Sequence, residues 1–162
     1  MARAKYLNQK GMSHVLALLM PENRLICEVM LHTGLRLGDV LTLRKEQIKM
    51  RFTIIESKTK KKRTVSLTKY LCETLRGDGR EGFCFPHKKF LDRHRTRQAV
   101  WRDVKRAAAA CRYRNISPHS TRKIFAVNYY GKHNNDLKKT QKILNHDNDV
   151  VTMLYALADK IG

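Results

Sequence analysis

Apolar residues recur at intervals of three and four along most of this chain, which predicts a largely helical fold. One helix is expected to open at Pro21, a residue suited to a first helical turn, and to close at Gly34. Its apolar face consists of Leu25, Ile26, Val29 and Met30. A second helix is expected to follow directly, and its apolar residues are Leu37, Val40, Leu41 and Leu43.

The pattern changes over residues 51–67, where short runs of β-branched side chains replace the helical spacing. The runs RFTIIES and RTVSL flank the basic segment KTKKK, and together they predict a β-hairpin. Residues 68–76 are expected to return to helix and to stop at Gly77-Asp78-Gly79. The segment GFCFP, residues 82–86, is a candidate third short strand.

A long basic helix is predicted from Thr96 through Trp101 to the alanines at 107–110. Its cations suit either a surface that follows a phosphate backbone or a plainly solvated face. They are Arg97, Arg102, Lys105, Arg106, Arg112 and Arg114.

Three further elements complete the expected fold. Ser117-Pro118 is a strong helix start, and the helix is expected to end at Gly131. Residues 135–144 form the next predicted helix, which Asn145 would end in a left-handed turn. Asp147 and Asp149 then offer caps for a last helix over residues 150–158.

Length and composition indicate one globular domain, because 162 residues with 42% hydrophobic residues can build a core. The longest apolar run, residues 15–20, is far shorter than the roughly 20 residues that a membrane span needs. There is no signal-peptide pattern, and the four cysteines are widely spaced, as is typical of reduced thiols. The expected location is therefore the cytoplasm.

Charge points to the partner. Lys and Arg number 34 against 14 Asp and Glu, which gives a formal net charge of +20. Such an excess favours nucleic acid, because each neutralised phosphate releases a condensed counterion. An anionic membrane is the competing partner, but the opening MARAKYLNQK supplies neither a clean basic amphipathic helix nor a lipidation signal.

A metal site is conceivable at Cys84, His87 and His94. A fourth ligand at finger-like spacing is missing, so a strand-end thiol near two solvated histidines is the preferred interpretation.

Three segments carry the candidate chemistry: HTGLRLGDVLTLR at 32–44, PHSTRKIFA at 118–126 and ILNHDNDVVTMLY at 143–155. In this order they resemble the boxes of the tyrosine recombinases, the phage-integrase family. Those boxes are an Arg after T-G-L, then H-x-x-R, then L-x-H with a Tyr nine residues on. Together with the hairpin lysine, the resemblance covers residues 13–158. It implies a mainly helical α+β catalytic-domain fold with a small antiparallel β-sheet, similar also to type IB topoisomerases.

Two arginines are the predicted phosphate ligands. A phosphodiester is anionic, so cleavage without a metal needs fixed positive charge where oxyanion charge develops. Arginine donates two parallel hydrogen bonds and keeps its charge near neutral pH. Arg36 comes just after a helix-ending glycine, and Arg122 lies in the first turns of a helix, where backbone N–H groups also favour an anion. Taken alone, each would be an ordinary exposed arginine.

Two histidines complete the expected anion site. His119 and Arg122 are three residues apart, so they share a helix face and are expected to touch one phosphate. The resemblance makes His119 a general base or phosphate ligand and places His146 at the family's second histidine or tryptophan position. A lone histidine is more often a capping or packing residue.

The resemblance makes Tyr155 the nucleophile. A phenol has a pKa of about 10, so it needs a base or nearby cations to attack at neutral pH. The alternative is a tyrosine packed beside Val151 and Ala158. In one unbroken helix, His146 and Tyr155 would lie on opposite faces about 13 Å apart. The polar stretch 145–149 is therefore expected to break the helix.

Lys58 matches the family's hairpin lysine, which protonates the leaving 5′ oxygen, and Lys60 is the rival assignment. The other lysines there are expected to be solvated. Asp39, three residues after Arg36, matches the acidic position of the first box and is expected to orient that arginine.

Some positions depart from the family pattern. Lys123 stands where histidine is common, and Asn145 stands where glycine is usual. Residues 1–162 are expected to form a single catalytic domain, with the N-terminal core-binding domain absent or removed. Only seven residues follow Tyr155, so a C-terminal segment that docks on a neighbouring subunit would be short or absent.

The expected function is that of a site-specific DNA recombinase or integrase catalytic domain. It would cleave and rejoin DNA through a 3′-phosphotyrosine, without metal or other cofactor, because the phosphotyrosine conserves the bond energy. Double-stranded DNA is the expected partner, with self-association on DNA as a synaptic tetramer and a monomer in solution. The alternatives are a non-catalytic DNA-binding remnant or regulator of the same fold, and a DNA-relaxing activity like that of type IB topoisomerases.

Overall fold

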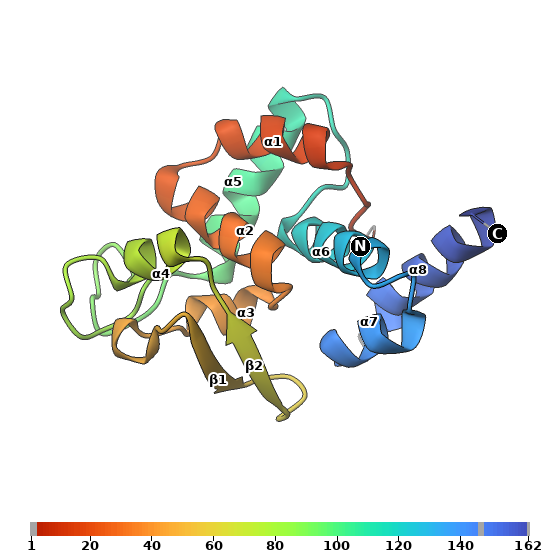
Figure 1. Cartoon of the computed structure of the whole chain (residues 1–162). Coiled ribbons are helices and arrows are strands. Elements are labelled where there is room, and N and C mark those ends of the chain that lie inside the picture. The colour runs from red at the N-terminus through yellow and green to blue at the C-terminus, as the bar shows by residue number, and fades with distance from the viewer. Residues whose placement is uncertain (1–2, 146–147, 162) are drawn as a thin grey trace.

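The computed structural model describes residues 3–145 and 148–161; for residues 149, 155, 156 and 158–161 it describes the backbone alone (Figure 1). In chain order the elements are α1 (Gln9–Ala17), α2 (Pro21–Thr33), α3 (Leu37–Leu41), the 3-10 helix η1 (Lys45–Gln47), β1 (Arg51–Ile55), β2 (Lys62–Ser66), α4 (Lys69–Arg76), α5 (Arg97–Ala110), α6 (Pro118–Lys132), α7 (Leu137–Ile143) and α8 (Asn148–Ile161).

Helix α2 lies at the centre of the fold and packs against α1, α3, α5 and α6 (Figure 1). Pro21 opens it and Gly34 closes it in the left-handed conformation at φ 67°, as predicted. A Cβ at Gly34 would also lie 2.3 Å from the Phe125 ring on α6. Glycine is therefore required both by the turn and by the close approach of α6.

The predicted hairpin is confirmed as an antiparallel pair in which Phe52 faces Val65 and Ile54 faces Arg63. Because side chains alternate along a strand, these four residues share the face that packs on the core. Val65 and Arg63 are buried there, at 2% and 5% exposure. The turn is closed by the Glu56 N–H, which donates to the Lys61 carbonyl at 3.0 Å.

The candidate third strand at residues 82–86 is not formed. Only isolated bridges occur there, between Arg44 and Phe83 and between Pro86 and His94. Gly82 has φ 130°, outside the range of a strand, and Pro86 has no N–H to donate to a ladder.

Side-chain caps set most helix starts. Thr68 and Thr96 accept backbone N–H groups at the starts of α4 and α5, and Ser117 heads α6. Helix α7 begins two residues later than predicted, because Asp136 accepts the Lys139 N–H as its cap.

The predicted break before the last helix is present. Helix α7 ends at Ile143, Asn145 is left-handed at φ 49°, and α8 begins at Asn148. Asp149 therefore lies inside α8 and does not cap it, whereas Asp147 is outside the described residues.

Two hydrophobic clusters form the core. The larger one extends over α1 to α6 and the hairpin. The smaller one joins α6 to α7 and α8 through Ala126, Leu144, Val150 and Leu154. Figure 1 shows α7 and α8 beside α6, on the side away from the hairpin's neighbour α4. None of the described helices is both long and apolar enough to cross a membrane.

Candidate active site

Arg36 is placed by the sharp end of α2. After Gly34 the chain buries Leu35 completely, and Arg36 follows in extended conformation as the residue that precedes α3. Its Nη1 donates to Glu56 Oε2 at 2.9 Å, and 15% of its side chain is exposed. Arg36 is therefore a held cation with one edge toward solvent.

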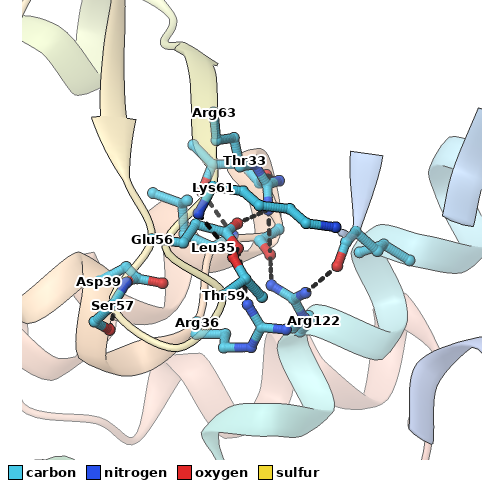
Figure 2. A network of polar contacts seen from close by, with 12 residues as sticks. Thr33, Leu35, Arg36, Asp39, Glu56, Ser57, Thr59, Lys61, Arg63 and Arg122 are labelled. Atoms are coloured by element: carbon cyan, nitrogen blue, oxygen red, sulfur yellow. Dashed lines mark hydrogen bonds and ion pairs between the residues drawn. The ribbon is translucent and has the colours of Figure 1, made fainter. Parts of the chain in front are cut away.

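Glu56 is the buried anion of the site, with 0% exposure at the end of β1 (Figure 2). Besides Arg36, its carboxylate accepts from Arg63 Nη1 at 3.0 Å and from Thr59 Oγ1 at 2.9 Å. Burial raises the pKa of the Glu56 carboxyl, but hydrogen bonds from the Asn145 amide, Arg63 and Thr59 together lower this pKa by more than burial raises it. The net shift of the pKa is therefore downward. Glu56 is consequently ionised and fixes Arg36 from behind.

Arg63 joins the hairpin to the end of α2. Beyond its bond to Glu56, it donates to the Thr33 carbonyl and, at 3.5 Å, to the Gly34 carbonyl. A cation is favourable at the C-terminal end of a helix, where carbonyl groups lack partners. Burial lowers the pKa of the Arg63 guanidinium, and the bond to Glu56 opposes that shift.

Arg122 is fully buried in α6 and also caps helix ends. Its Nη1 donates to the Gly34 carbonyl, and its Nη2 donates to the Leu144 carbonyl at 2.9 Å (Figure 2). These acceptors lie two residues before Arg36 and two residues before His146. Arg122 thus connects the two segments that carry those predicted site residues.

One surface hollow of about 500 Å³ brings three predicted site residues together. We call it the Arg36 hollow. It is lined by Arg36, Leu37, Gly38, Ser57, Lys58, Arg97 and His119. Arg36 comes from the α2–α3 junction, Lys58 from the hairpin turn and His119 from the first turn of α6. Arg122 is buried and is not among the residues that line the hollow, so the predicted contact of His119 and Arg122 with one phosphate stays a prediction.

The two hairpin lysines differ in position. Lys58 is exposed and lines the Arg36 hollow. Lys60 does not line it; its left-handed backbone at φ 57° lets its N–H donate to the Glu56 carbonyl at 2.9 Å. This geometry favours Lys58 as the lysine of the site.

The expected role of Asp39 is wrong. Its Oδ1 accepts from the Ser57 N–H at 2.8 Å and the Ser57 Oγ at 2.7 Å. Among the described residues, the carboxylate that binds Arg36 is Glu56. Asp39 projects from α3 toward the hairpin turn, so it anchors the residue beside Lys58.

Sequence reasoning missed Glu56 and Arg63, and it named Arg97 only as one of six cations on a basic helix. The alternation along KRTVS contained a signal for Arg63, because it places Arg63 on the same strand face as buried Val65. A buried arginine then requires a carboxylate nearby. No signal in the sequence distinguishes Arg97 from the other cations of its helix, yet it reaches the Arg36 hollow from α5.

Two predicted residues cannot be placed in this geometry. His146 lies outside the described residues, and Tyr155 is described only by its backbone, which belongs to α8. Its neighbour Leu154 is buried in the smaller core and fixes this part of α8 against α6.

The remaining candidates, Lys123 and the Cys84 group, lie in surroundings that explain them by packing and hydrogen bonding within the fold. Lys123 is buried and donates to the Ala4 carbonyl at 2.6 Å, which ties the N-terminal segment to α6. Cys84, His87 and His94 do not form a cluster that could hold a metal ion, nor does any other group in the described part of the chain. Burial raises the pKa of the Cys84 thiol to about 12, which disfavours a thiolate ligand.

Comparison with known proteins identifies the family. The profile of the phage integrase family matches residues 5–160. The chain is 30% identical over 152 residues to the integrase of Escherichia phage P2, covering 93% of this chain and 42% of that protein. It is 32% identical over 148 residues to the tyrosine recombinase XerD of Pseudomonas aeruginosa, covering 82% and 48%. This chain therefore spans less than half the length of these two relatives.

The fold agrees with that relationship. A lambda integrase dimer bound to a COC′ core site matches with a TM-score of 0.73 at 18% identity, over 95% of this chain and 60% of that one. The expected architecture, mainly helical α+β with a small antiparallel sheet, is confirmed as the catalytic-domain fold of tyrosine recombinases. The chain belongs to the phage integrase family of tyrosine recombinases.

Proposed function

We propose that this chain is the catalytic part of a site-specific DNA recombinase or integrase, which cleaves and rejoins strands of double-stranded DNA. The observation that carries the proposal is the Arg36 hollow, where Arg36, Lys58 and His119 meet from three separate parts of the fold. A net charge of +20 supports a polyanionic partner. The DNA-bound state of the lambda integrase neighbour is consistent with that partner.

The proposed reaction begins with a DNA phosphate in the Arg36 hollow. Arg36, held by Glu56, donates to the non-bridging oxygens and stabilises the charge that develops on them. His119 adds a second contact from the first turn of α6. We assign Arg122 and His146 to the same anion site. Arg122 is buried and does not line the hollow, and it contributes its positive charge and holds the segments that carry Arg36 and His146.

The bond changes balance without an external energy source. The Tyr155 oxygen attacks phosphorus and gives its proton to His119, the expected general base, as a 3′-phosphotyrosyl bond forms and the bond to the 5′ oxygen breaks. Lys58 gives the leaving oxygen a proton, so a free 5′-hydroxyl is released. Attack by the 5′-hydroxyl of a partner strand reverses these steps. Because the phosphotyrosine conserves the bond energy, the reaction needs no nucleotide or redox cofactor. We propose that copies of the chain associate on DNA during this exchange.

A covalent-capture experiment tests the proposal. The protein is incubated, with EDTA present, with a library of nicked duplexes whose arms are randomised, and denaturing gels are searched for a protein–DNA adduct. We expect an adduct that Tyr155→Phe abolishes and that phosphodiesterase digestion of the linkage releases. DNA retention without adduct across the whole library would contradict catalysis and indicate a DNA-binding module. Relaxation of supercoiled DNA without strand exchange would indicate a topoisomerase-like activity instead.

A further inference from the structure

A second hollow, of about 580 Å³, adjoins the Arg36 hollow. We call it the Trp101 hollow. It is lined by Met30, Leu37, Arg97, Gln98, Trp101, Arg102, Ser117, Pro118 and His119. Leu37, Arg97 and His119 line both hollows, so the two spaces share a wall. A molecule with one group in the Arg36 hollow can therefore place the next group in the Trp101 hollow.

Trp101 is the single tryptophan of the chain and is 41% exposed. An exposed tryptophan beside a hollow offers a flat apolar surface that water solvates poorly. Arg97, Trp101 and Lys105 are spaced four residues apart on α5, so they form one stripe along the helix. The Lys105 ammonium lies 4.7 Å from the centre of the Trp101 ring.

Three cations of α5, Arg97, Arg102 and Lys105, differ from Arg106 in their ion pairing. Arg106 binds the Asp103 carboxylate at 2.6 Å, so its charge is compensated within the fold. No carboxylate among the described residues forms an ion pair with Arg97, Arg102 or Lys105. The phosphate-following interpretation of this helix therefore applies to Arg97, Arg102 and Lys105, for which it stays a prediction.

Arg97 stands at the boundary between the two hollows. A Cβ at Gly38 would lie only 2.6 Å from Arg97 Nη2, so the guanidinium lies directly on the Gly38 backbone. The absence of a side chain at residue 38 allows Arg97 to face both hollows at once. A cation in that place suits a phosphate that links one nucleotide to the next.

We propose that the Trp101 hollow binds the nucleobase next to the scissile phosphate, unstacked from its neighbours and placed against the Trp101 ring, with Arg97 and Arg102 on the flanking phosphate. This inference rests on the proposed function, because it places the scissile phosphate in the Arg36 hollow. The hollow combines an aromatic face with cations that form no ion pair within the described part of the chain, and single-stranded nucleic acid is recognised by that combination.

Magnitudes decide between the base and Lys105 as the partner of the ring. An exposed cation–π contact favours association about 2- to 5-fold. A base stacked on an aromatic side chain favours it about 5- to 140-fold. The base therefore displaces the ammonium, and Lys105 can turn to a phosphate.

The test removes single bases from the DNA. Abasic residues are placed one at a time on either side of the cleaved phosphate in a captured site, and dissociation constants are measured by fluorescence anisotropy. For the wild-type chain we expect one position at which the abasic residue weakens binding 5-fold or more. In Trp101→Ala that position should lose its effect, while intact DNA binds as weakly as the abasic duplex binds to wild type.

Two further variants keep the result interpretable. Trp101→Phe keeps an aromatic face and should keep the abasic profile, which separates stacking from loss of folding. Tyr70→Ala removes an aromatic residue of α4 that is 66% exposed and does not line the Trp101 hollow. This variant should leave the abasic profile unchanged. Arg97→Ala should reduce the slope of log Kd against log salt by about 0.9.

A profile that is flat for the wild type, or that is the same in Trp101→Ala, would overturn the inference. The covalent adduct reports separately on the proposed function. An adduct with a flat abasic profile removes the base site alone, whereas a Trp101-dependent profile without an adduct supports the base site and contradicts the chemistry.

Discussion

Replacing Glu56 by Gln tests whether the buried carboxylate organises the site. The change preserves the shape of the side chain but removes the charge that faces Arg36 at 2.9 Å and Arg63 at 3.0 Å. Glu56 is fully buried and the Arg63 side chain is 4% exposed, so Arg63 cannot turn to water for compensation. The Gln amide can accept from only one of the two guanidinium groups.

The expected loss of stability follows from this geometry. Removing one partner of a buried ion pair costs about 3–5 kcal/mol, and the isosteric amide places this variant at the lower end, about 3 kcal/mol. In a chain of this size that loss lowers the melting temperature by about 6–12 °C. Urea unfolding should show a lower midpoint with an unchanged m-value.

A matched control is available on the surface. Glu73→Gln makes the same chemical change in the Lys69–Glu73 pair, which is separated by 3.9 Å and has side chains 81% and 67% exposed. Its expected cost is about 0.5 kcal/mol or less. The double variant Glu56→Gln/Arg63→Met should lose less than the sum of its single changes, because it removes both buried charges together. If Glu56→Gln proves no more costly than Glu73→Gln, the buried pair does not stabilise the fold as argued.

Three other predictions concern the turn at Gly34, the hairpin residue Lys58 and the dependence of stability on pH. Gly34→Ala should lower the unfolding free energy by about 2–5 kcal/mol, because residue 34 has φ 67° and its Cβ would overlap the Phe125 ring. Gly131→Ala, with open space around it, should be neutral or stabilising by up to about 1 kcal/mol, and equal urea midpoints for the two variants would refute this reasoning. Lys58→Ala should lose cleavage and regain it on DNA with a bridging 5′ sulfur, whose thiolate leaves without a proton, while Lys60→Ala should cleave normally; no rescue would remove Lys58 as the acid. Folding lowers the pKa of Glu56 and Asp103, so their contribution to stability is complete above the unfolded pKa of about 4 and is lost as pH falls through the folded pKa. The difference in unfolding free energy between wild type and Glu56→Gln should therefore shrink below about pH 4, and a difference that grows in acid would contradict the direction of the pKa shift.

Most of the fold could be predicted because its boundaries depend on local chemistry. Gly34, Thr96, Ser117 and Asn145 each determine a helix end through their own backbone or side chain, and all four act as expected. The segment at 82–86 misled the prediction because strand formation depends on a partner, and its apolar residues have only single bridges there.

The site was less accessible from sequence for the same reason. Arg36 and Glu56 are 20 residues apart, and Arg122 and Gly34 are 88 apart, so no local pattern relates them. Spacing alone assigned Asp39 to Arg36, because a residue three positions along a helix is normally a neighbour. Arg36 precedes α3 in extended conformation, however, and its side chain turns toward the hairpin instead.

The two carbonyls held by Arg122 belong to parts of the chain that are synthesised far apart in time. The Gly34 carbonyl is available early, but the Leu144 carbonyl emerges only near the end of translation. A nascent chain can therefore build its larger core before this arginine has both acceptors. The contact with Leu144 forms last, so an unfinished polypeptide on the ribosome lacks one of the two bonds through which Arg122 connects the end of α2 to the end of α7.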